Sequence, residues 1–273
     1  PTTYDAHLQW LPKGKKVVVT VHDLNMVTVP QYYRDVNRVW PSLADQKKVT
    51  QRADHIIAVS ENTKGDLINY WNIPEEKITT IYHGIGPALK NLSPERVFPF
   101  DYILYVGHRN AYKNFNNCLR AFKSINNIHK MLNLVCTGVR FQKNELAQIS
   151  KLKLENRVFA VSATEEQMAR LYRDALLFVY PSYYEGFGMP ILEAMQYHCP
   201  VVLSDASCFP EIAQDAAYYF DPHNEGKMAE VMLDVIDNVS LRNTLIQKGD
   251  IRIRNFSWGE SANGHMAVYK SLL

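Results

Sequence analysis

The chain has 273 residues, of which 47% are apolar and 21% are charged, a balance that is ordinary for a globular protein with a sizeable core. Its 30 basic and 28 acidic side chains leave a formal net charge of +2, whereas nucleic-acid-binding proteins normally carry a basic face, so we expect no nucleic-acid partner. No apolar run approaches the ~20 residues that span a membrane, and the N-terminus lacks a signal-peptide pattern. We therefore expect a cytoplasmic protein, and peripheral membrane contact through a local basic patch stays open.

Short apolar runs alternate with segments of helical periodicity along the chain. The expected strands are Val17–Val21, His55–Val59, Ile78–Tyr82, Tyr102–Val106, Leu132–Cys136, Val158–Val161, Leu176–Tyr180, Val201–Leu203 and Ala216–Phe220. The clearest expected helices are Glu61–Trp71 after Ser60, Gly226–Asn238, and Thr164–Arg173, in which Thr164 and Gln167 form a capping box. This alternation predicts an α/β protein with parallel sheets.

A proline-containing segment of little periodicity, residues 86–100, predicts a linker between two α/β units. We place the domains at residues 1–95 and 96–255, with residues 256–273 as a C-terminal helix. The second domain contains enough strands for a complete doubly wound sheet, but the first has three where five or six are usual. The strand Val17–Val21 has the composition of a strand buried on both faces and would lie at a sheet edge, so either a partner chain covers it or sequence is missing.

The four cysteines predict neither a zinc site nor a disulfide framework. Cys118, Cys136, Cys199 and Cys208 fall at irregular spacings, with no C-x-x-C pair. Zinc sites usually show such a pair, and disulfides are rare inside cells. We expect four reduced and mostly buried thiols.

The most informative motif is a nonapeptide, residues 185–193 (EGFGMPILE), which follows an expected strand and leads into an expected helix. The C-terminal end of a parallel strand, followed by a helix N-terminus, is a usual place for a phosphate-bearing ligand. Gly186 and Gly188 allow the backbone to approach a diphosphate closely. Glu185 and Glu193 can accept hydrogen bonds from paired sugar hydroxyls. The alternative is a glycine turn with two solvated glutamates.

A second loop, residues 107–114 (GHRNAYKN), follows the expected strand Tyr102–Val106 and carries two cations. Arg109 can bridge phosphate oxygens bidentately and Lys113 supplies a mobile point charge, a pairing that suits two linked phosphates. Because both loops leave the C-terminal edge of the same expected sheet, we expect them to face one ligand. The alternative is a charged loop on a solvated face.

Together these loops resemble the family 4 retaining glycosyltransferases of the GT-B fold, whose hallmark is a glutamate pair framing a Gly-Phe-Gly loop. The matching landmarks are Pro181-Ser182, Glu193-Ala194-Met195, Val201–Asp205 and Pro210-Glu211-Ile212, then Val106-Gly107 with Arg109 and Lys113-Asn114, and upstream His22-Asp23, Val59-Ser60 and His83-Gly84-Ile85. The resemblance implies two Rossmann-like, doubly wound parallel-sheet domains. The first would be incomplete, because the strand and glycine-rich loop with which family members begin do not precede Pro1. The C-terminal helix would cross back to this first domain.

The resemblance also implies catalytic roles. Glu185 would meet the donor sugar near its reacting face, and Glu193 would bind the ribose hydroxyls. Arg109 and Lys113 would bind the diphosphate and neutralise the charge of the departing nucleotide. His22 would contact the donor sugar or its phosphate, and the alternative is a strand-end histidine that satisfies local backbone groups.

Further donor contacts are implied by the resemblance. They are Gly186, Phe187, Gly188 and Met189, through backbone amides, and Thr137, Gly138 and Val161, which would border the base. No Asp-x-Asp pair occurs in the chain, so a carboxylate-held divalent cation under the diphosphate has no obvious ligands. We therefore expect metal-independent chemistry, with no cofactor beside the donor substrate.

The predicted activity is the transfer, with retention of configuration, of a hexose from a GDP- or UDP-linked donor to a glycan or lipid-linked acceptor. Tyr184–Gly188, with Pro190 and Leu192–Met195, is most similar to bacterial mannosyltransferases of surface-polysaccharide assembly, which favours mannose. The incomplete first domain leaves the acceptor open. The alternative is a nucleotide-sugar-binding module that is inactive without a missing N-terminal half or a partner chain.

Overall fold

The computed structural model describes residues 2–3, 14–33, 43–109 and 111–273. The chain divides into two compact units. Unit 1 comprises Pro1–Gly86, Tyr184–Gly188 and Phe256–Leu273, and unit 2 comprises Pro87–Tyr183 and Met189–Asn255. The first boundary thus falls at Gly86, ahead of the expected position near residue 95. The sequence did not predict that Tyr184–Gly188 is grouped with unit 1.

Unit 1 contains a four-stranded parallel sheet of order β1-β2-β3-β4. Its strands are β1 (Thr2–Thr3), β2 (Val18–Val21), β3 (His55–Ala58) and β4 (Ile78–Thr80). The last three match the expected strands. β1 pairs with β2 through Thr2 opposite Val19, so β2 has a strand on both sides. The expected edge position of β2 is therefore wrong.

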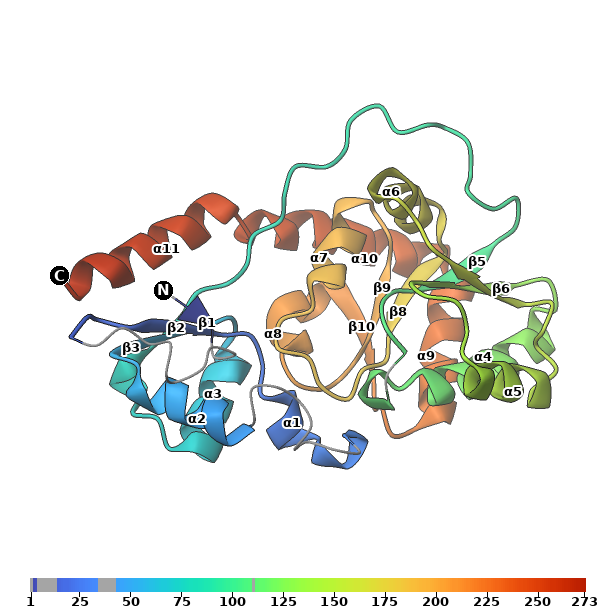
Figure 1. Cartoon of the computed structure of the whole chain (residues 1–273). Coiled ribbons are helices and arrows are strands. Elements are labelled where there is room, and N and C mark those ends of the chain that lie inside the picture. The colour runs from blue at the N-terminus through green and yellow to red at the C-terminus, as the bar shows by residue number, and fades with distance from the viewer. Residues whose placement is uncertain (1, 4–13, 34–42, 110) are drawn as a thin grey trace. The chain divides into compact units, whose positions relative to one another are not determined.

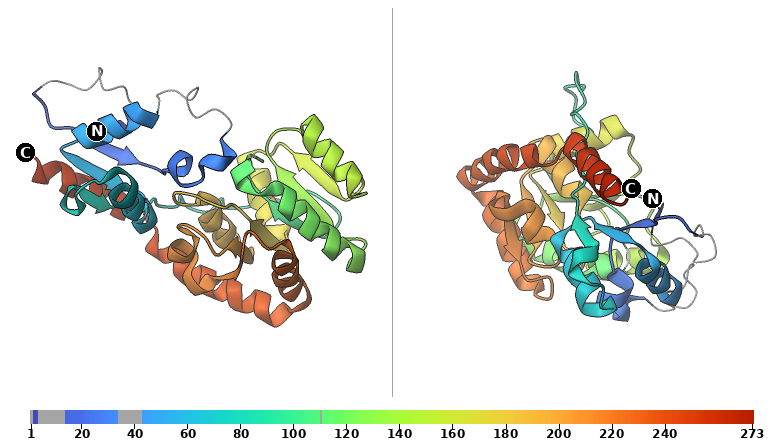
Figure 2. Two further views of the ribbon diagram at one scale, coloured as in Figure 1. Left: turned by 90° about the horizontal axis from the view of Figure 1, so that it is seen from below. Right: turned by 90° about the vertical axis from the view of Figure 1, so that its left-hand side faces the viewer.

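Helices cover both faces of the unit 1 sheet. They are α1 (Asn25–Thr28), α2 (Leu43–Arg52), α3 (Glu61–Trp71) and α11 (Trp258–Ser271). Val19 of β2 packs in one cluster with Val49 of α2 and Leu67 of α3. Val18, on the opposite face, packs with Val268 of α11. Figure 1 and the right-hand view of Figure 2 show α11 on one side of the strands, with α2 and α3 on the other.

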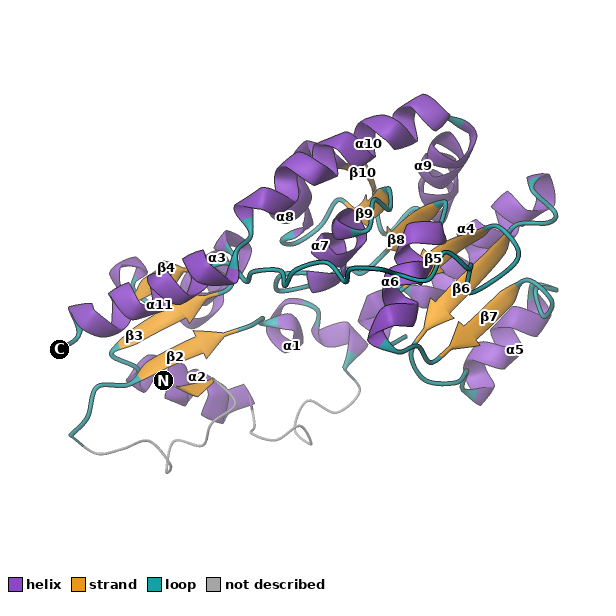
Figure 3. Ribbon diagram, turned by 90° about the horizontal axis from the view of Figure 1, so that it is seen from above, coloured by secondary structure: helices purple, strands orange, loops and turns teal. Residues whose placement is uncertain are grey.

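Unit 2 contains a six-stranded parallel sheet of order β10-β9-β8-β5-β6-β7 (Figure 3). The strands are β5 (Tyr102–Tyr105), β6 (Asn133–Thr137), β7 (Val158–Val161), β8 (Leu177–Tyr180), β9 (Val201–Ser204) and β10 (Ala217–Phe220). All neighbours are parallel. Counted in chain order from β5, this is the doubly wound order 3-2-1-4-5-6. The prediction of an α/β, doubly wound domain is confirmed.

Helices also cover both faces of the unit 2 sheet. They are α4 (Phe115–Ile128), α5 (Lys143–Lys151), α6 (Glu165–Asp174), α7 (Met189–Gln196), α8 (Phe209–Ala213), α9 (Glu225–Asp237) and α10 (Val239–Arg252). Figure 1 shows α4, α5 and α9 on one face and α6 with α7 on the other. The predicted capping box of α6 is confirmed, since the Gln167 amide donates to Thr164 Oγ1 at 3.3 Å and the Thr164 amide donates to Gln167 Oε1 at 3.0 Å.

Short 3-10 turns complete the description. They span Pro30–Tyr32, Glu75–Lys77, Ala111–Lys113, Gln214–Ala216 and Ile253–Asn255. The turn Ala111–Lys113 lies between β5 and α4 and ends at one of the two predicted phosphate-binding cations. The local backbone therefore fixes where that side chain begins.

All four cysteines are free and buried, as the sequence predicted. Burial raises the pKa of the Cys118 thiol to about 12. Cys136 is also fully enclosed, and burial raises its pKa well above the ordinary thiol value. A buried thiol of raised pKa carries little thiolate, so these side chains act as small core residues.

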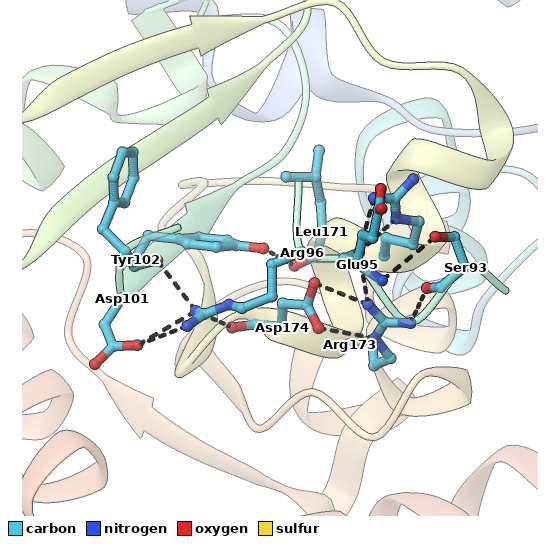
Figure 4. A network of polar contacts seen from close by, with 10 residues as sticks. Ser93, Glu95, Arg96, Asp101, Tyr102, Leu171, Arg173 and Asp174 are labelled. Atoms are coloured by element: carbon cyan, nitrogen blue, oxygen red, sulfur yellow. Dashed lines mark hydrogen bonds and ion pairs between the residues drawn. The ribbon is translucent and has the colours of Figure 1, made fainter. Parts of the chain in front are cut away.

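Arginine side chains hold the linker against unit 2 (Figure 4). Arg173 Nη1 donates to the Ser93 carbonyl oxygen at 2.7 Å, and Arg173 also pairs with Asp174 at 2.7 Å. Arg170 Nη2 donates to the Glu95 carbonyl oxygen at 2.7 Å. The linker from Ser93 onward is thus bound to α6, which explains why its residues belong to unit 2.

We expect Arg173→Ala to loosen the linker. The change removes the donor to Ser93 and leaves the Asp174 side chain, which is 10% exposed, without its ion pair. Loss of such charge-assisted bonds costs on the order of 1–3 kcal/mol of folding free energy. Limited proteolysis should cut residues 93–100 several-fold faster, whereas the exposed Arg254→Ala should leave the cleavage rate unchanged. Equal rates in both variants would contradict the anchoring role.

Candidate functional site

The site in unit 2 lies where the strand order reverses, between β5 and β8. These two strands are neighbours in the sheet although β6 and β7 separate them in the chain. The loops that follow them leave the same sheet edge, and the Tyr183 amide of one donates to the Tyr112 carbonyl of the other at 2.9 Å. Such a switch point is the usual ligand-binding place in an open parallel sheet.

Lys113 places a cation at this switch point. Its Nζ lies 3.3 Å from the Tyr180 hydroxyl oxygen and 5.3 Å from the centre of the Tyr180 ring. The Tyr112 ring lies 5.2 Å away on another side. Aromatic rings stabilise an ammonium by cation–π attraction without neutralising its charge. Lys113 is therefore oriented by Tyr112 of its own loop and by Tyr180 at the end of β8, and its binding of a diphosphate stays a prediction.

Asn114 fixes the end of the same loop, a role that the sequence did not reveal. Its side chain is 4% exposed, and its Nδ2 donates to the Pro222 carbonyl oxygen at 2.8 Å. Its backbone has a φ of 58°, a left-handed conformation that asparagine tolerates better than most residues. The residue after Lys113 is thus held in place by a neighbouring loop.

Arg109 lies in a different environment from Lys113. Its guanidinium is 2% exposed, and Nε donates to Glu145 Oε1 at 2.8 Å. Nη2 donates to the carbonyl oxygens of Val139 and Arg140, at 2.5 Å and 3.2 Å. The Phe141 ring lies 4.9 Å from the guanidinium carbon. Protein acceptors therefore use most of its donors, and binding of diphosphate by Arg109 stays a prediction that this geometry does not support.

Glu145 is the partner that sequence reasoning missed. Its side chain is 8% exposed, and its second oxygen accepts from the Gln142 amide at 2.6 Å, which closes a capping box at the start of α5. One carboxylate thus ties Arg109 of the β5 loop to the start of α5. The signal that could have found it is the Gln-x-x-Glu spacing of a capping box.

Thr137, Gly138 and Val161 lie together at the ends of β6 and β7. The Gly138 amide donates to the Val161 carbonyl oxygen at 3.0 Å, and Gly138 has a φ of +114°. A Cβ atom at Gly138 would make only an ordinary contact, 3.4 Å from the Gly107 carbonyl oxygen, so the positive φ is what favours glycine at this position. Thr137 and Gly138 border the β5 loop, and the contact of all three residues with a base stays a prediction.

Glu193 stands on the second turn of α7, as the nonapeptide predicted. Its Oε2 accepts from the Tyr172 hydroxyl of α6 at 2.9 Å. Burial, and then the Glu193 charge, raise the pKa of Tyr172 far above its ordinary value, so the phenol stays a donor. The hydrogen bond holds one oxygen of the carboxylate in place, and binding of ribose hydroxyls by Glu193 stays a prediction.

The glycine loop belongs to unit 1 by its contacts. The Gly186 carbonyl oxygen accepts from Ser60 Oγ at 2.7 Å, and a Cβ atom on Gly186 would lie 1.7 Å from the His22 carbonyl oxygen. Phe187 is 5% exposed and packs edge-on against His83 at 4.9 Å between ring centres. Glu185 is half-buried between these anchored residues. Gly188 has a φ of +88°, which ends the loop before Met189 begins α7.

His22 follows β2 and its ring stacks on His83, with 5.6 Å between ring centres. Burial, and then the charges of His22 and His265, lower the pKa of His83 to about 4. His83 is therefore neutral near pH 7, and the exposed His22 lies between this neutral ring and solvent. The backbone of His22 faces Gly186 while its side chain stays accessible.

Within the described residues, no group of three His, Cys, Asp or Glu side chains lies close enough to hold a metal ion. In the same parts of the chain, no helix combines the length and apolar character needed to span a bilayer.

Two known protein families match long stretches of the chain. The model of glycosyl transferases group 1 matches residues 98–252, and the model of glycosyltransferase family 4 matches residues 2–89. The chain is a family 4 glycosyltransferase of the GT-B fold. The resemblance based on the glutamate pair and the β5 loop is thereby confirmed, as is the expected transferase class.

This glycosyltransferase is similar to proteins of O-antigen assembly. It is 27% identical to O-antigen chain mannosyltransferase B of Escherichia coli, over 94% of this chain and 71% of that protein. It is 28% identical to O-antigen chain mannosyltransferase RfbU of Salmonella typhimurium, over 79% of this chain and 59% of that protein. The chain therefore spans between about half and three quarters of these relatives.

Solved structures share the fold of this glycosyltransferase. Sucrose-phosphate synthase from Thermosynechococcus elongatus superposes with a TM-score of 0.77 at 21% sequence identity, over 93% of this chain and 67% of that one. At this identity the likeness shows the fold alone. It agrees with the doubly wound sheet of unit 2 and the parallel sheet of unit 1.

We expect Arg109→Ala to act mainly on stability. The change leaves the Glu145 carboxylate buried without its partner, and breaking a buried pair costs ~3–5 kcal/mol. Urea unfolding measures this cost. The matched control is Arg120→Ala, whose pair with Glu225 is exposed and worth ~0–1 kcal/mol. If Arg109→Ala kept full stability and instead lost affinity for GDP, the predicted phosphate role would be right.

We expect Gly186→Ala to displace the glycine loop, because no rearrangement of a side chain can relieve a Cβ atom 1.7 Å from a backbone oxygen. Transfer should fall by at least 100-fold, with a lowered melting temperature. Gly65→Ala is the matched control. An added Cβ there meets nothing within 4 Å, and alanine in the middle of α3 should stabilise the protein by roughly 0.5–1 kcal/mol. Wild-type transfer by Gly186→Ala would contradict the described loop.

Proposed function

We propose that the chain is a retaining, metal-independent mannosyltransferase that uses GDP-mannose and a glycan or lipid-linked acceptor. The observation that carries the proposal is the hydrogen bond from Lys113 to the Tyr180 hydroxyl at the switch point of unit 2. It supplies an oriented cation at the C-terminal end of β8. The names of the two O-antigen relatives favour mannose as the sugar.

In the proposed reaction, Lys113 binds the diphosphate and stabilises the negative charge that develops on the departing GDP. The first amides of α7, from Met189 onward, add hydrogen-bond donors to the same group. Electrostatic stabilisation of a leaving group is commonly the largest catalytic contribution. The Glu193 oxygen that does not accept from Tyr172 takes a ribose hydroxyl.

Glu185 binds the hexose in this proposal and does not act as a nucleophile. The acceptor hydroxyl attacks the anomeric carbon on the face from which GDP departs, and a leaving phosphate oxygen takes its proton, so the configuration is retained. A carboxylate near that carbon stabilises the positive charge that develops on the sugar. His22, which is accessible, is the second residue proposed to contact the sugar or its phosphate.

Metal independence follows in this proposal from the protein cation. Lys113 supplies the positive charge that a divalent ion would otherwise bring to the diphosphate. The rate of transfer should therefore be the same with EDTA as with added Mg²⁺ or Mn²⁺. A rate that falls with EDTA and returns with Mg²⁺ would contradict this part of the proposal.

We expect binding experiments to distinguish the residue that binds the diphosphate from the residue that binds the sugar. GDP-mannose at 100 times its dissociation constant should raise the free energy of unfolding by ~2.7 kcal/mol, whereas UDP-glucose should stabilise less. Lys113→Ala should weaken GDP and GDP-mannose alike by at least tenfold. Glu185→Gln should weaken GDP-mannose and leave GDP unchanged, because it is proposed to bind only the sugar. Thermal-shift titration measures all three.

The control and the activity assay complete this experiment. Lys130→Ala removes an exposed lysine that precedes β6 and should leave both ligands unaffected. Transfer is followed as radiolabelled mannose moved from GDP-mannose to a mannose-terminated oligosaccharide. Glu193→Gln with wild-type donor affinity and rate would contradict the site. GDP-mannose binding without transfer or hydrolysis would favour the alternative, a binding module that needs another chain segment or subunit for activity.

A further inference from the structure

The segment Tyr184–Gly188 joins β8 to α7, two elements of unit 2, yet its own contacts group it with unit 1. We propose that this attachment positions Glu185 for sugar transfer, and that Tyr184, Asp66 and Ser60 are positioning residues of the reaction. The inference rests on the role proposed above for Glu185. It assigns a function to three residues that are not themselves proposed to contact the donor.

Tyr184 forms the first anchor, immediately before Glu185. Its ring is 5% exposed, and its hydroxyl donates to Asp66 Oδ2 at 2.5 Å. The same hydroxyl accepts from the Leu24 amide at 3.4 Å, and Asn62 Nδ2 donates to Asp66 Oδ2 at 3.0 Å. A short O–H···O⁻ bond is about twice as strong as a neutral one. The residue that precedes Glu185 is therefore held by α3 and by the loop after β2.

The Asp66 carboxylate is itself partly buried. Burial raises its pKa, while the hydrogen bonds from Tyr184 and Asn62 act in the opposite direction. Burial, and then the Asp66 charge, raise the pKa of Tyr184. The phenol therefore keeps its proton and stays a donor to Asp66. A partly buried carboxylate with two donors makes this anchor costly to break.

Gly186 forms the second anchor, immediately after Glu185. Its carbonyl oxygen accepts from Ser60 Oγ at 2.7 Å and from Thr63 Oγ1 at 3.4 Å, and both hydroxyls are fully buried. Ser60 is also the N-cap of α3, where its Oγ accepts from the Thr63 amide at 3.0 Å. One serine hydroxyl thus begins the helix and holds the loop. The glycine is required here because the His22 carbonyl lies where a side chain would start.

Phe187 extends the attachment by one residue. Its ring contacts His83 at 4.9 Å, Phe256 at 5.9 Å and Tyr82 at 6.1 Å between ring centres. Aromatic contacts of this kind contribute ~0.5–1.5 kcal/mol each beyond burial of their area. Among residues 184–187, Tyr184 and Phe187 are buried and residue 186 is a glycine. Glu185 is thus the one residue of the four with a half-buried side chain.

These anchors define where the Glu185 carboxylate can reach. A group that acts on a reacting centre has to be held within ~0.5 Å of its productive position, and loops achieve this only when neighbouring contacts fix them. Both peptide neighbours of Glu185 are fixed by hydrogen bonds to α3. Loss of either anchor should leave the carboxylate present but misplaced, and misplacement by about 1 Å can cost on the order of 100-fold in rate.

The first test measures the attachment itself and does not depend on activity. Hydrogen–deuterium exchange of the amides in residues 184–188 should become at least tenfold faster in Tyr184→Phe and in Ser60→Ala. Tyr70→Phe, which removes an exposed hydroxyl from the same helix α3, is the matched control and should leave exchange unchanged. Unchanged loop exchange in both Tyr184→Phe and Ser60→Ala would overturn the inference, whatever the enzyme does.

The second test asks whether the anchors act through Glu185. With GDP-mannose as donor, Tyr184→Phe should lower kcat by 10- to 100-fold, while GDP binds as in the wild type. In a Glu185→Gln background the same change should have less than a twofold further effect, because the carboxylate that it positions is already absent. A merely destabilising change would multiply with Glu185→Gln and would also weaken GDP binding.

The outcomes separate the two proposals. A kcat within twofold of wild type in Tyr184→Phe, or independent effects of Tyr184→Phe and Glu185→Gln, would overturn the positioning role. Full activity of Glu185→Gln would instead overturn the role proposed for that glutamate, and the exchange experiment would still report on the attachment. Asp66→Asn is the second variant if Tyr184→Phe fails to fold, and it should show the same coupling to Glu185.

Discussion

The reversal of strand order between β5 and β8 is the constraint on which the unit 2 site depends. The sheet grows from β5 toward β7 in one direction and from β8 toward β10 in the other. The loops after β5 and β8 are therefore next to each other at the C-terminal edge, with no crossover helix between them. Because of this topology, Lys113 contacts Tyr112 and Tyr180, and Tyr183 bonds to Tyr112.

Three charged side chains of the candidate site are each held by a polar partner from another element. Lys113 is oriented by Tyr180, and Glu193 by Tyr172. Arg109 shows the limit of this pattern, since Glu145 and backbone carbonyls use most of its donors. A buried guanidinium with these partners fixes a loop and does not easily bind a mobile anion. One basic residue of this loop, Arg109, therefore serves structure, while the other, Lys113, is oriented by tyrosine side chains.

Sequence reasoning succeeded where the signal is local. Buried parallel strands are short apolar runs, so the expected strands of both units agree with the structure to within about one or two residues at each end. Helix α3 begins after Ser60 as predicted, because an N-cap is a local pattern. The pairing of β1 with β2 was missed, since two threonines carry no periodicity.

The rest depends on contacts between residues far apart in the chain. Glu145 follows Arg109 by 36 residues, and Tyr184 follows Asp66 by 118, so no local pattern joins either pair. For the same reason the sequence could indicate that a glutamate at 185 has a chemical role, but not which helix holds its loop. The family resemblance identified the motif, and only the fold shows its supports.

The four enclosed thiols have a practical consequence for solution studies. Alkylating and maleimide reagents attack thiolates, whereas all four sulfur atoms are buried and burial raises the pKa of the Cys118, Cys136 and Cys199 thiols. A single cysteine introduced on an exposed surface should therefore take up a fluorophore or spin label selectively in the native enzyme. The natural sequence thus accepts spectroscopic reporters without prior removal of its own sulfhydryl groups.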